Sequence, residues 1–121
     1  MNPVNWFEIP VKNINESKAF YEAAFGFEML IHKMGDILMA WFPSANNESG
    51  ASGSLIEGES YEPSHLGSMV YFSVDDIEAV LTKVVENKGK ILNAKMDIGE
   101  YGFFAHFEDI AGNRIGLHSM K

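Results

Sequence analysis

The chain has 121 residues, no cysteine and a formal net charge of −8 at pH 7. A chain of this length buries about two-thirds of its unfolded surface, so we expect one domain with a single hydrophobic core. The composition excludes disulfides, thiol nucleophiles and zinc–thiolate sites, and the acidic balance argues against nucleic acid and anionic membrane surfaces as partners.

The first element in chain order is a predicted strand over residues 4–11, where aromatic and β-branched residues alternate weakly with others. Pro10 has no backbone N–H to give to a sheet, so we expect this strand at an edge. Asn13 with Glu16 three residues later resembles a capping box, and Gly26 suits a helix C-terminus, so a helix is predicted between them. Its expected inward-facing residues are Phe20, Tyr21, Ala24 and Phe25.

The rest of the first half predicts three more strands. They are residues 27–33, 37–42 and 54–56. A turn at residues 35–36 joins the first two, and residues 43–53, rich in Ser, Ala, Asn, Glu and Gly, predict a loop before the third. A polar segment at residues 58–67 contains glycine and proline, and we expect it to link the two halves.

The second half of the chain predicts the same order of elements. A strand over residues 69–74 leads to an N-cap at Asp76 and a helix that ends at Gly89. The expected inner stripe of this helix is Ile77, Val80, Leu81, Val84 and Val85. Strands are predicted at residues 91–96, 103–107 and 114–118, with a turn at residues 109–113.

The two halves are copies of one unit. Val11-Lys12-Asn13-Ile14 returns as Val74-Asp75-Asp76-Ile77, 63 residues later. We therefore predict an α+β fold of two tandem βαβββ modules, residues 1–57 and 68–121, joined by a linker at residues 58–67. Four strands with a helix on one face leave the other face uncovered, so two such faces should meet or curl into an open cavity.

Four segments of the chain match one known family in their order and spacing. They are Phe7-Glu8-Ile9-Pro10-Val11, then Phe20-Tyr21 with Phe25-Gly26-Phe27, then Val74-Asp75-Asp76-Ile77, and finally Phe107-Glu108-Asp109-Ile110-Ala111-Gly112-Asn113-Arg114-Ile115. In these segments the chain resembles the vicinal-oxygen-chelate superfamily, which has the glyoxalase/bleomycin-resistance/dioxygenase fold. The resemblance implies a curved sheet or open barrel around a cavity, often a divalent metal in that cavity, and frequently a homodimer.

The same resemblance implies four metal-ligand positions, on the first and last strand of each module. Here these positions hold Trp6, Ser54 (or Gly53), Met69 and Gly116. Hard divalent ions bind carboxylate oxygen or imidazole nitrogen, so this set does not suit them. We expect no cofactor, and a divalent metal only through a non-standard site.

Three polar residues are expected close to the vacant ligand positions. Residues two apart on a strand share a face, which places Glu8 with Trp6, Tyr71 with Met69 and His118 with Gly116. Glu8 and His118 could be an acid/base pair, two ligands of a displaced metal site, or structural polar groups. A second pair, His106 and Glu108, has a spacing that could serve a metal, but we expect it to face solvent.

Large apolar residues are expected to line a concave pocket. The predicted ligand-binding set is Trp6, Glu8, Met39, Trp41, Met69, Tyr71 and His118. A soft apolar wall suits a flat aromatic ligand held by stacking. The alternative is that these side chains fill the cavity and leave no pocket.

Three functions remain open at this point. The first is a metal-free protein, similar to the glyoxalase and bleomycin-resistance proteins, that binds a small organic molecule. The second is a lyase, isomerase or dioxygenase that works through Glu8 and His118, and the third is a module that assembles with another chain. We expect a homodimer, because exposed edges such as the Pro10 strand favour pairing. Without an apolar run of ~20 residues or a signal peptide, a cytoplasmic location is expected.

Overall fold

The computed structural model describes residues 2–44 and 49–121. In chain order its elements are β1 (Trp6–Pro10), α1 (Ile14–Phe25), β2 (Leu30–Met34), β3 (Ile37–Trp41), β4 (Ser52–Glu57), β5 (Tyr71–Ser73), α2 (Ile77–Glu86), β6 (Lys90–Asp97), the 3-10 helix η1 (Gly99–Tyr101), β7 (Phe103–Glu108) and β8 (Arg114–Ser119). The predicted α+β class and the repeated strand–helix–three-strand order are confirmed. No helix in the described part of the chain has the length and apolar character that a membrane span requires.

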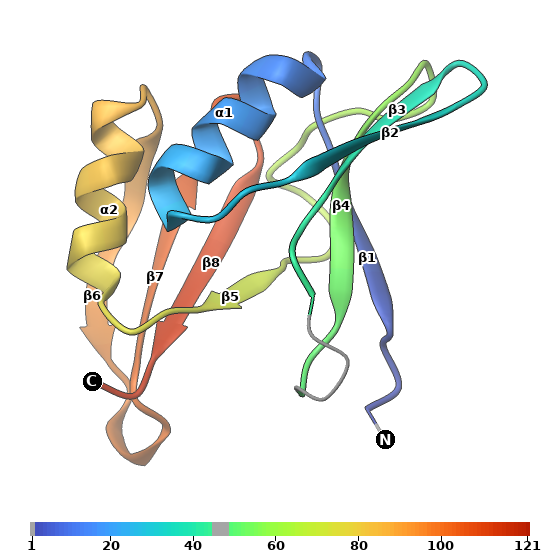
Figure 1. Ribbon diagram of the computed structural model, residues 1–121. Helices are drawn as coiled ribbons and strands as arrows, with labels where there is room; N and C mark the ends of the chain where they lie inside the picture. The colour runs from blue at the N-terminus through green and yellow to red at the C-terminus, as the bar shows by residue number, and fades with distance from the viewer. Residues whose placement is uncertain (1, 45–48) are drawn as a thin grey trace.

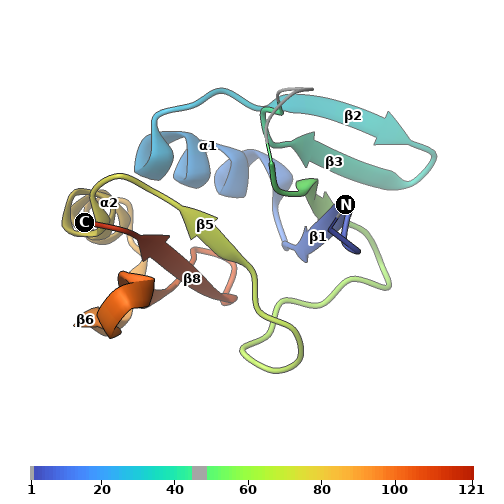
Figure 2. The ribbon, with the colours of Figure 1, turned by 90° about the horizontal axis from the view of Figure 1, so that it is seen from below.

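The strands form two four-stranded sheets with the same internal order (Figure 1). Sheet A has the order β1-β4-β3-β2 and sheet B the order β5-β8-β7-β6. In each sheet the first strand pairs parallel with the last, while the remaining pairs are antiparallel. In Figure 2 the edge strands β1 and β5 lie near the middle of the molecule, and β2 and β6 lie at its outer ends. Over the described residues the sheets are separate, so they do not close into a barrel.

Side-chain caps define where both helices begin. The side chain of Asn13 accepts a hydrogen bond from the Glu16 backbone N–H at 3.0 Å, as half of the predicted capping box. The side chain of Asp76 accepts from the Ala79 backbone N–H at 3.1 Å. Helix α1 ends before Gly26, whose φ of +78° suits glycine, so both predicted limits of this helix are confirmed.

The C-terminus of α2 differs from the prediction. The helix ends at Glu86, and Lys88, not Gly89, has the left-handed backbone, with a φ of +75°. The Gly89 N–H then donates to the Val84 carbonyl at 2.8 Å, which completes a Schellman-type cap. A Cβ on Gly89 would lie 2.9 Å from the Glu108 carbonyl oxygen, so the glycine allows close packing instead of ending the helix. Val85 is also exposed and does not belong to the inner stripe.

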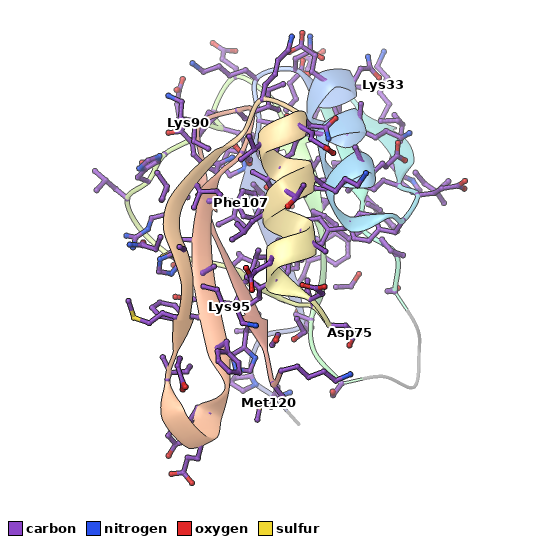
Figure 3. All side chains as sticks on the ribbon, turned by 90° about the vertical axis from the view of Figure 1, so that its left-hand side faces the viewer. Lys33, Asp75, Lys90, Lys95, Phe107 and Met120 are labelled. Atoms are coloured by element: carbon purple, nitrogen blue, oxygen red, sulfur yellow. The ribbon has the colours of Figure 1, made fainter. Side chains whose placement is uncertain are left out.

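One hydrophobic core joins both modules, because the helices pack side by side between the sheets (Figures 1 and 2). Aromatic rings from both halves meet there: Tyr21 and Phe42 come from the first, and Phe72 and Phe107 from the second. Figure 3 shows Phe107 beside α2. The core therefore lies on the helix-covered faces of the two sheets.

A buried polar network also connects the modules. The Tyr21 hydroxyl donates to Oδ2 of Asp109 at 2.7 Å, and Asn113 Nδ2 donates to the Pro10 carbonyl at 2.7 Å. Burial raises the pKa of the Tyr21 hydroxyl well above its ordinary value, and the Asp109 carboxylate raises it further. Burial also raises the pKa of Asp109, while its hydrogen-bond donors act in the opposite direction. Tyr21 and Asp109 are 88 residues apart and belong to two of the segments that resemble the family. These two segments therefore meet in this network.

Candidate functional site

Each sheet has one face without a helix, which we call its open face. On β1, Ile9 is buried in the core, whereas Trp6 and Glu8 point away from it and are exposed. On β5, Phe72 packs against the core while Tyr71 is exposed. Trp6, Trp41 and Tyr71 keep 36%, 39% and 48% of their surface exposed, so the open faces do not cover each other within one chain.

Aromatic side chains cluster on the open face of sheet A. The Trp6 and Trp41 rings meet edge to face with centroids 5.4 Å apart, and the His32 ring stacks on Trp41 at 3.9 Å. Met39, predicted to line a pocket, is buried instead, opposite Ile56 of β4. The open face of sheet A is therefore an aromatic surface, and the buried Met39 side chain leaves no deep pocket at its own position.

Two buried polar atoms of sheet A have no hydrogen-bond partner among the described residues. They are the Ser54 hydroxyl and Nε2 of His32. Ser54 is fully buried and pairs with both Glu8 and Trp41 in the sheet. An unpaired buried hydroxyl costs free energy, so a hydrogen-bonding ligand or water at Ser54 would be stabilised.

Four residues form a row across the open face of sheet B. The strand register places Tyr71 opposite Gly116, Gly116 opposite His106, and His106 opposite Asn93. The Tyr71 hydroxyl lies 2.6 Å from Nε2 of His106, and Nδ1 of the same imidazole lies 2.8 Å from Oδ1 of Asn93. A tyrosine, a histidine and an amide are thus joined in one line.

Gly116 makes this row possible. Tyr71 is on β5 and His106 on β7, and β8 lies between them. A Cβ on Gly116 would lie 2.5 Å from Cε2 of the Tyr71 ring, closer than packed atoms approach. The ring therefore crosses β8 over the glycine, and Tyr71 occupies the position where the family resemblance implies a ligand side chain.

The predicted solvent exposure of His106 is wrong. Only 5% of its surface is exposed, because the Tyr71 ring and the Phe104 ring, 5.0 Å away, cover it. Burial lowers the pKa of His106, and the guanidinium of Arg114, 3.2 Å from Nδ1, lowers it further. The imidazole is therefore neutral at pH 7. The sequence contains a signal for this: His106 shares a strand face with Phe104, and the facing glycine leaves room for a ring.

The other predicted site residues lie apart from this row. Glu8 is exposed and borders a hollow of about 90 Å³ between β1, β8 and the linker. His118, on the open face of sheet B, is held by a 2.6 Å contact between its Nε2 and the Tyr101 carbonyl oxygen. Met69 precedes β5 and is half-buried. No described contact joins Glu8 to His118, and their pairing stays a prediction.

The linker is fixed over one end of sheet B. The Ser64 backbone N–H donates to Oδ1 of Asn113 at 3.0 Å, and Nε2 of His65 lies 2.8 Å from Oε1 of Glu108. Lys90 approaches the same carboxylate at 3.8 Å. The Glu108 carboxylate therefore interacts with His65 and Lys90 and does not face the row that contains His106.

The donor set does not fit a divalent metal. Within residues 2–44 and 49–121 no three His, Asp or Glu side chains are grouped closely enough to hold an ion. The implied positions carry an indole, a hydroxyl, a thioether and a glycine covered by a tyrosine ring.

A separate hollow lies between the two helices. It measures about 630 Å³ and runs between the C-terminal end of α1 and the N-terminal end of α2. Phe25, Phe27, Asp76 and Lys83 are among its lining residues. It is open to solvent and contains none of the predicted site residues.

Comparisons with known proteins agree with the fold. The model of the Glyoxalase/Bleomycin resistance protein/Dioxygenase superfamily matches residues 4–117. One similar protein is CFP32 of Mycobacterium bovis, whose name assigns it provisionally to the glyoxylases. It is 27% identical over 117 residues, and the match covers 93% of this chain and 44% of the CFP32 chain. A glyoxylase-like domain-containing protein of Didymella fabae is 27% identical over 114 residues, 91% of this chain and 88% of its own.

Solved structures show the same fold at low identity. The glyoxylase/bleomycin resistance protein/dioxygenase domain from Frankia sp. EAN1pec has a TM-score of 0.76 at 13% identity, covering 100% of this chain and 99% of its own. A glyoxalase I variant from Zea mays has a TM-score of 0.71 at 21% identity, covering 98% of this chain and 47% of its own. The chain thus spans about half the length of the mycobacterial relative and of the maize enzyme.

Proposed function

Because the chain belongs to the glyoxalase/bleomycin resistance protein/dioxygenase superfamily, we propose that it binds a small organic molecule, preferably an aromatic one, on its open faces and without a metal. The observation that carries this proposal is the exposed pair of Trp6 and Trp41. Exposed indole rings in edge-to-face contact offer a flat ligand both stacking and edge contacts. The buried Ser54 hydroxyl below them favours a ligand that also carries a hydrogen-bonding oxygen or nitrogen.

A second copy of the chain is part of the proposal. Each open face alone is too exposed to remove a small molecule from water, and binding sites usually bury most of their ligand. The aromatic face of sheet A and the polar face of sheet B, with Arg114, His106 and His118, differ in chemistry, so one face of each copy can cover the other face of its partner. The double length of the maize chain leaves room for a second domain of this size, which also favours a paired arrangement.

Tryptophan fluorescence tests the binding proposal directly. The chain has two tryptophans, Trp6 and Trp41, and both lie on the open face of sheet A. Phenylacetone, an aromatic ketone, should quench their emission saturably. Cyclohexylacetone, which keeps the carbonyl but lacks the aromatic ring, should bind about 2- to 12-fold more weakly, because aromatic contacts contribute about 0.5–1.5 kcal/mol beyond their area.

Variants separate this site from general hydrophobic binding. Trp41→Leu keeps Trp6 as the reporter and should lose the preference for phenylacetone. Tyr101→Leu removes an exposed aromatic side chain on η1 and should leave the binding unchanged. Equal affinity for the two ketones would contradict the proposal. A metal ion would also contradict it, if elemental analysis finds about one per chain and its removal abolishes binding.

A further inference from the structure

Two opposite charges that do not pair with each other border the hollow between β1, β8 and the linker. Arg114, on β8, is the one arginine of the chain, and Glu8 lies on β1. Among the residues that the structure describes, neither side chain forms an ion pair within 4.0 Å. Nη2 of Arg114 lies 3.2 Å from Nδ1 of His106, which leaves the other N–H groups of the guanidinium for a further partner. The hollow therefore has room for a group that binds both charges.

The size and charge of this hollow suit a small zwitterion. Its volume of about 90 Å³ corresponds to a few water molecules, or to an ammonium and a carboxylate carried on one carbon atom. Glu62, on the linker, adds a second carboxylate to the lining. An anion alone would meet two like charges, and an amine alone would leave the guanidinium without an anion. The charges together therefore favour a head group that has both signs.

A row of three residues leads from this hollow to the aromatic side chains of sheet A. The strand register places Glu8 opposite Ser54, and Ser54 opposite Trp41. Neighbouring strands lie about 4.8 Å apart, so the row measures about 10 Å. The Ser54 hydroxyl is fully buried and has no hydrogen-bond partner among the described residues. An ammonium group has only donors, so it can satisfy the hydroxyl oxygen and the Glu8 carboxylate together.

We propose that the ligand of this protein is an aromatic α-amino acid. This inference rests on the proposed binding function and names its class of ligand. The aromatic ring lies against Trp6 and Trp41. The ammonium group binds Glu8 and Ser54, and the carboxylate binds the Arg114 guanidinium. Residues two apart on a strand are about 7 Å apart, which is comparable to the separation of the ring from the charged groups in such a molecule.

Tryptophan fluorescence with four small molecules tests this class of ligand. L-Phenylalanine carries the ring and both charges, whereas hydrocinnamate lacks the ammonium group, phenethylamine lacks the carboxylate, and phenylacetone is uncharged. L-Phenylalanine should quench the emission of the wild-type protein with a Kd at least about 10-fold lower than the other three, because hydrogen bonds between charged groups are the strong ones. An affinity for L-phenylalanine that does not exceed that for both single-charge analogues would overturn the inference.

Two amide substitutions separate charge recognition from a structural role. Arg114→Gln should weaken L-phenylalanine binding about 10-fold and strengthen phenethylamine binding, because it removes a positive charge that repels the ammonium group. Glu8→Gln should weaken L-phenylalanine binding by a similar factor and strengthen hydrocinnamate binding. The affinity for uncharged phenylacetone should stay unchanged in both variants. Glu28→Gln, at an exposed position outside the hollow, is the matched control and should change none of these affinities.

Each outcome decides between the two proposals. Saturable binding of phenylacetone without a preference for L-phenylalanine overturns the amino-acid ligand and leaves the binding function intact. A preference that survives in both Arg114→Gln and Glu8→Gln also overturns the amino-acid ligand. If none of the four molecules binds saturably, the binding function and the class of ligand both fail. The comparison of the four molecules needs only the wild-type chain, so it remains decisive if a variant does not fold.

Discussion

Asp109 is a carboxylate placed where every neighbour is a donor. Oδ1 accepts from the backbone N–H groups of Ala111 and Asn113, while Oδ2 accepts from the Tyr21 hydroxyl and from Asn113 Nδ2. Four hydrogen bonds offset the cost of burying the charge, which explains how a carboxylate with 2% exposure is retained between the modules.

Replacing this carboxylate with an amide should therefore destabilise the fold. In Asp109→Asn an NH2 group must face one pair of donors, so we expect a loss of about 2–3 kcal/mol in the free energy of unfolding. Urea unfolding at pH 7 measures it. Asp75→Asn, at an exposed position that precedes α2, is the matched control and should change the stability by less than about 0.5 kcal/mol. A loss as small as that of the control would contradict the role given to the network.

Side-chain positions across strands were the hardest part of the site to predict. Alternation along β1 and β5 placed Trp6, Glu8 and Tyr71 on the faces that the structure shows. Alternation cannot say which residues meet across a sheet, because that depends on register and on side-chain direction. The contact between Tyr71 and His106 spans 35 residues and depends on Gly116, so the sequence pattern placed His106 on the surface instead.

Most elements follow from local signals, and α2 shows where those signals fail. Caps at Asn13, Gly26 and Asp76 were predictable because each residue type has a local reason to be there. At the C-terminus of α2, Gly89 is needed because only a residue without a Cβ can pack this closely against the Glu108 carbonyl. Lys88 therefore adopts the left-handed backbone conformation. Tertiary packing thus overrides the preference for glycine at the helix end.

This strained position gives a prediction at the scale of the element. Lys88→Gly relieves the positive φ, and should stabilise the protein by about 0.5–1 kcal/mol in urea unfolding. Lys95→Gly removes a lysine from β6, where the backbone is extended and the ammonium lies 4.5 Å from the centre of the Phe103 ring, and should destabilise instead. The same sign for both substitutions would show that the backbone strain at Lys88 is not what limits stability.

At the scale of the whole molecule, the repeat explains both the fold and its incomplete surface. Each module buries one face of its sheet against helices, and the shared aromatic core joins these covered faces. The duplication predicted this arrangement, but it could not decide whether the second faces meet within a chain. In the structure they do not, and exposed apolar side chains remain on β2, namely Leu30, which lies opposite Trp41, and Met34, which lies opposite Ile37.

The uncovered faces lead to the last prediction, a homodimer. Sedimentation equilibrium should give twice the 13.5 kDa chain mass, and tryptophan emission should shift to shorter wavelength as dimers form, because a partner would cover Trp6 and Trp41. Met34→Glu adds a charge on this face and should weaken dimerisation at least about 10-fold, since one unpaired charge in an interface costs more than about 1.4 kcal/mol. Val85→Glu, at a 53% exposed position on α2 and away from both open faces, should leave it unaffected. Equal effects of the two substitutions, or a monomer at high concentration, would exclude the open face of sheet A as the dimer surface.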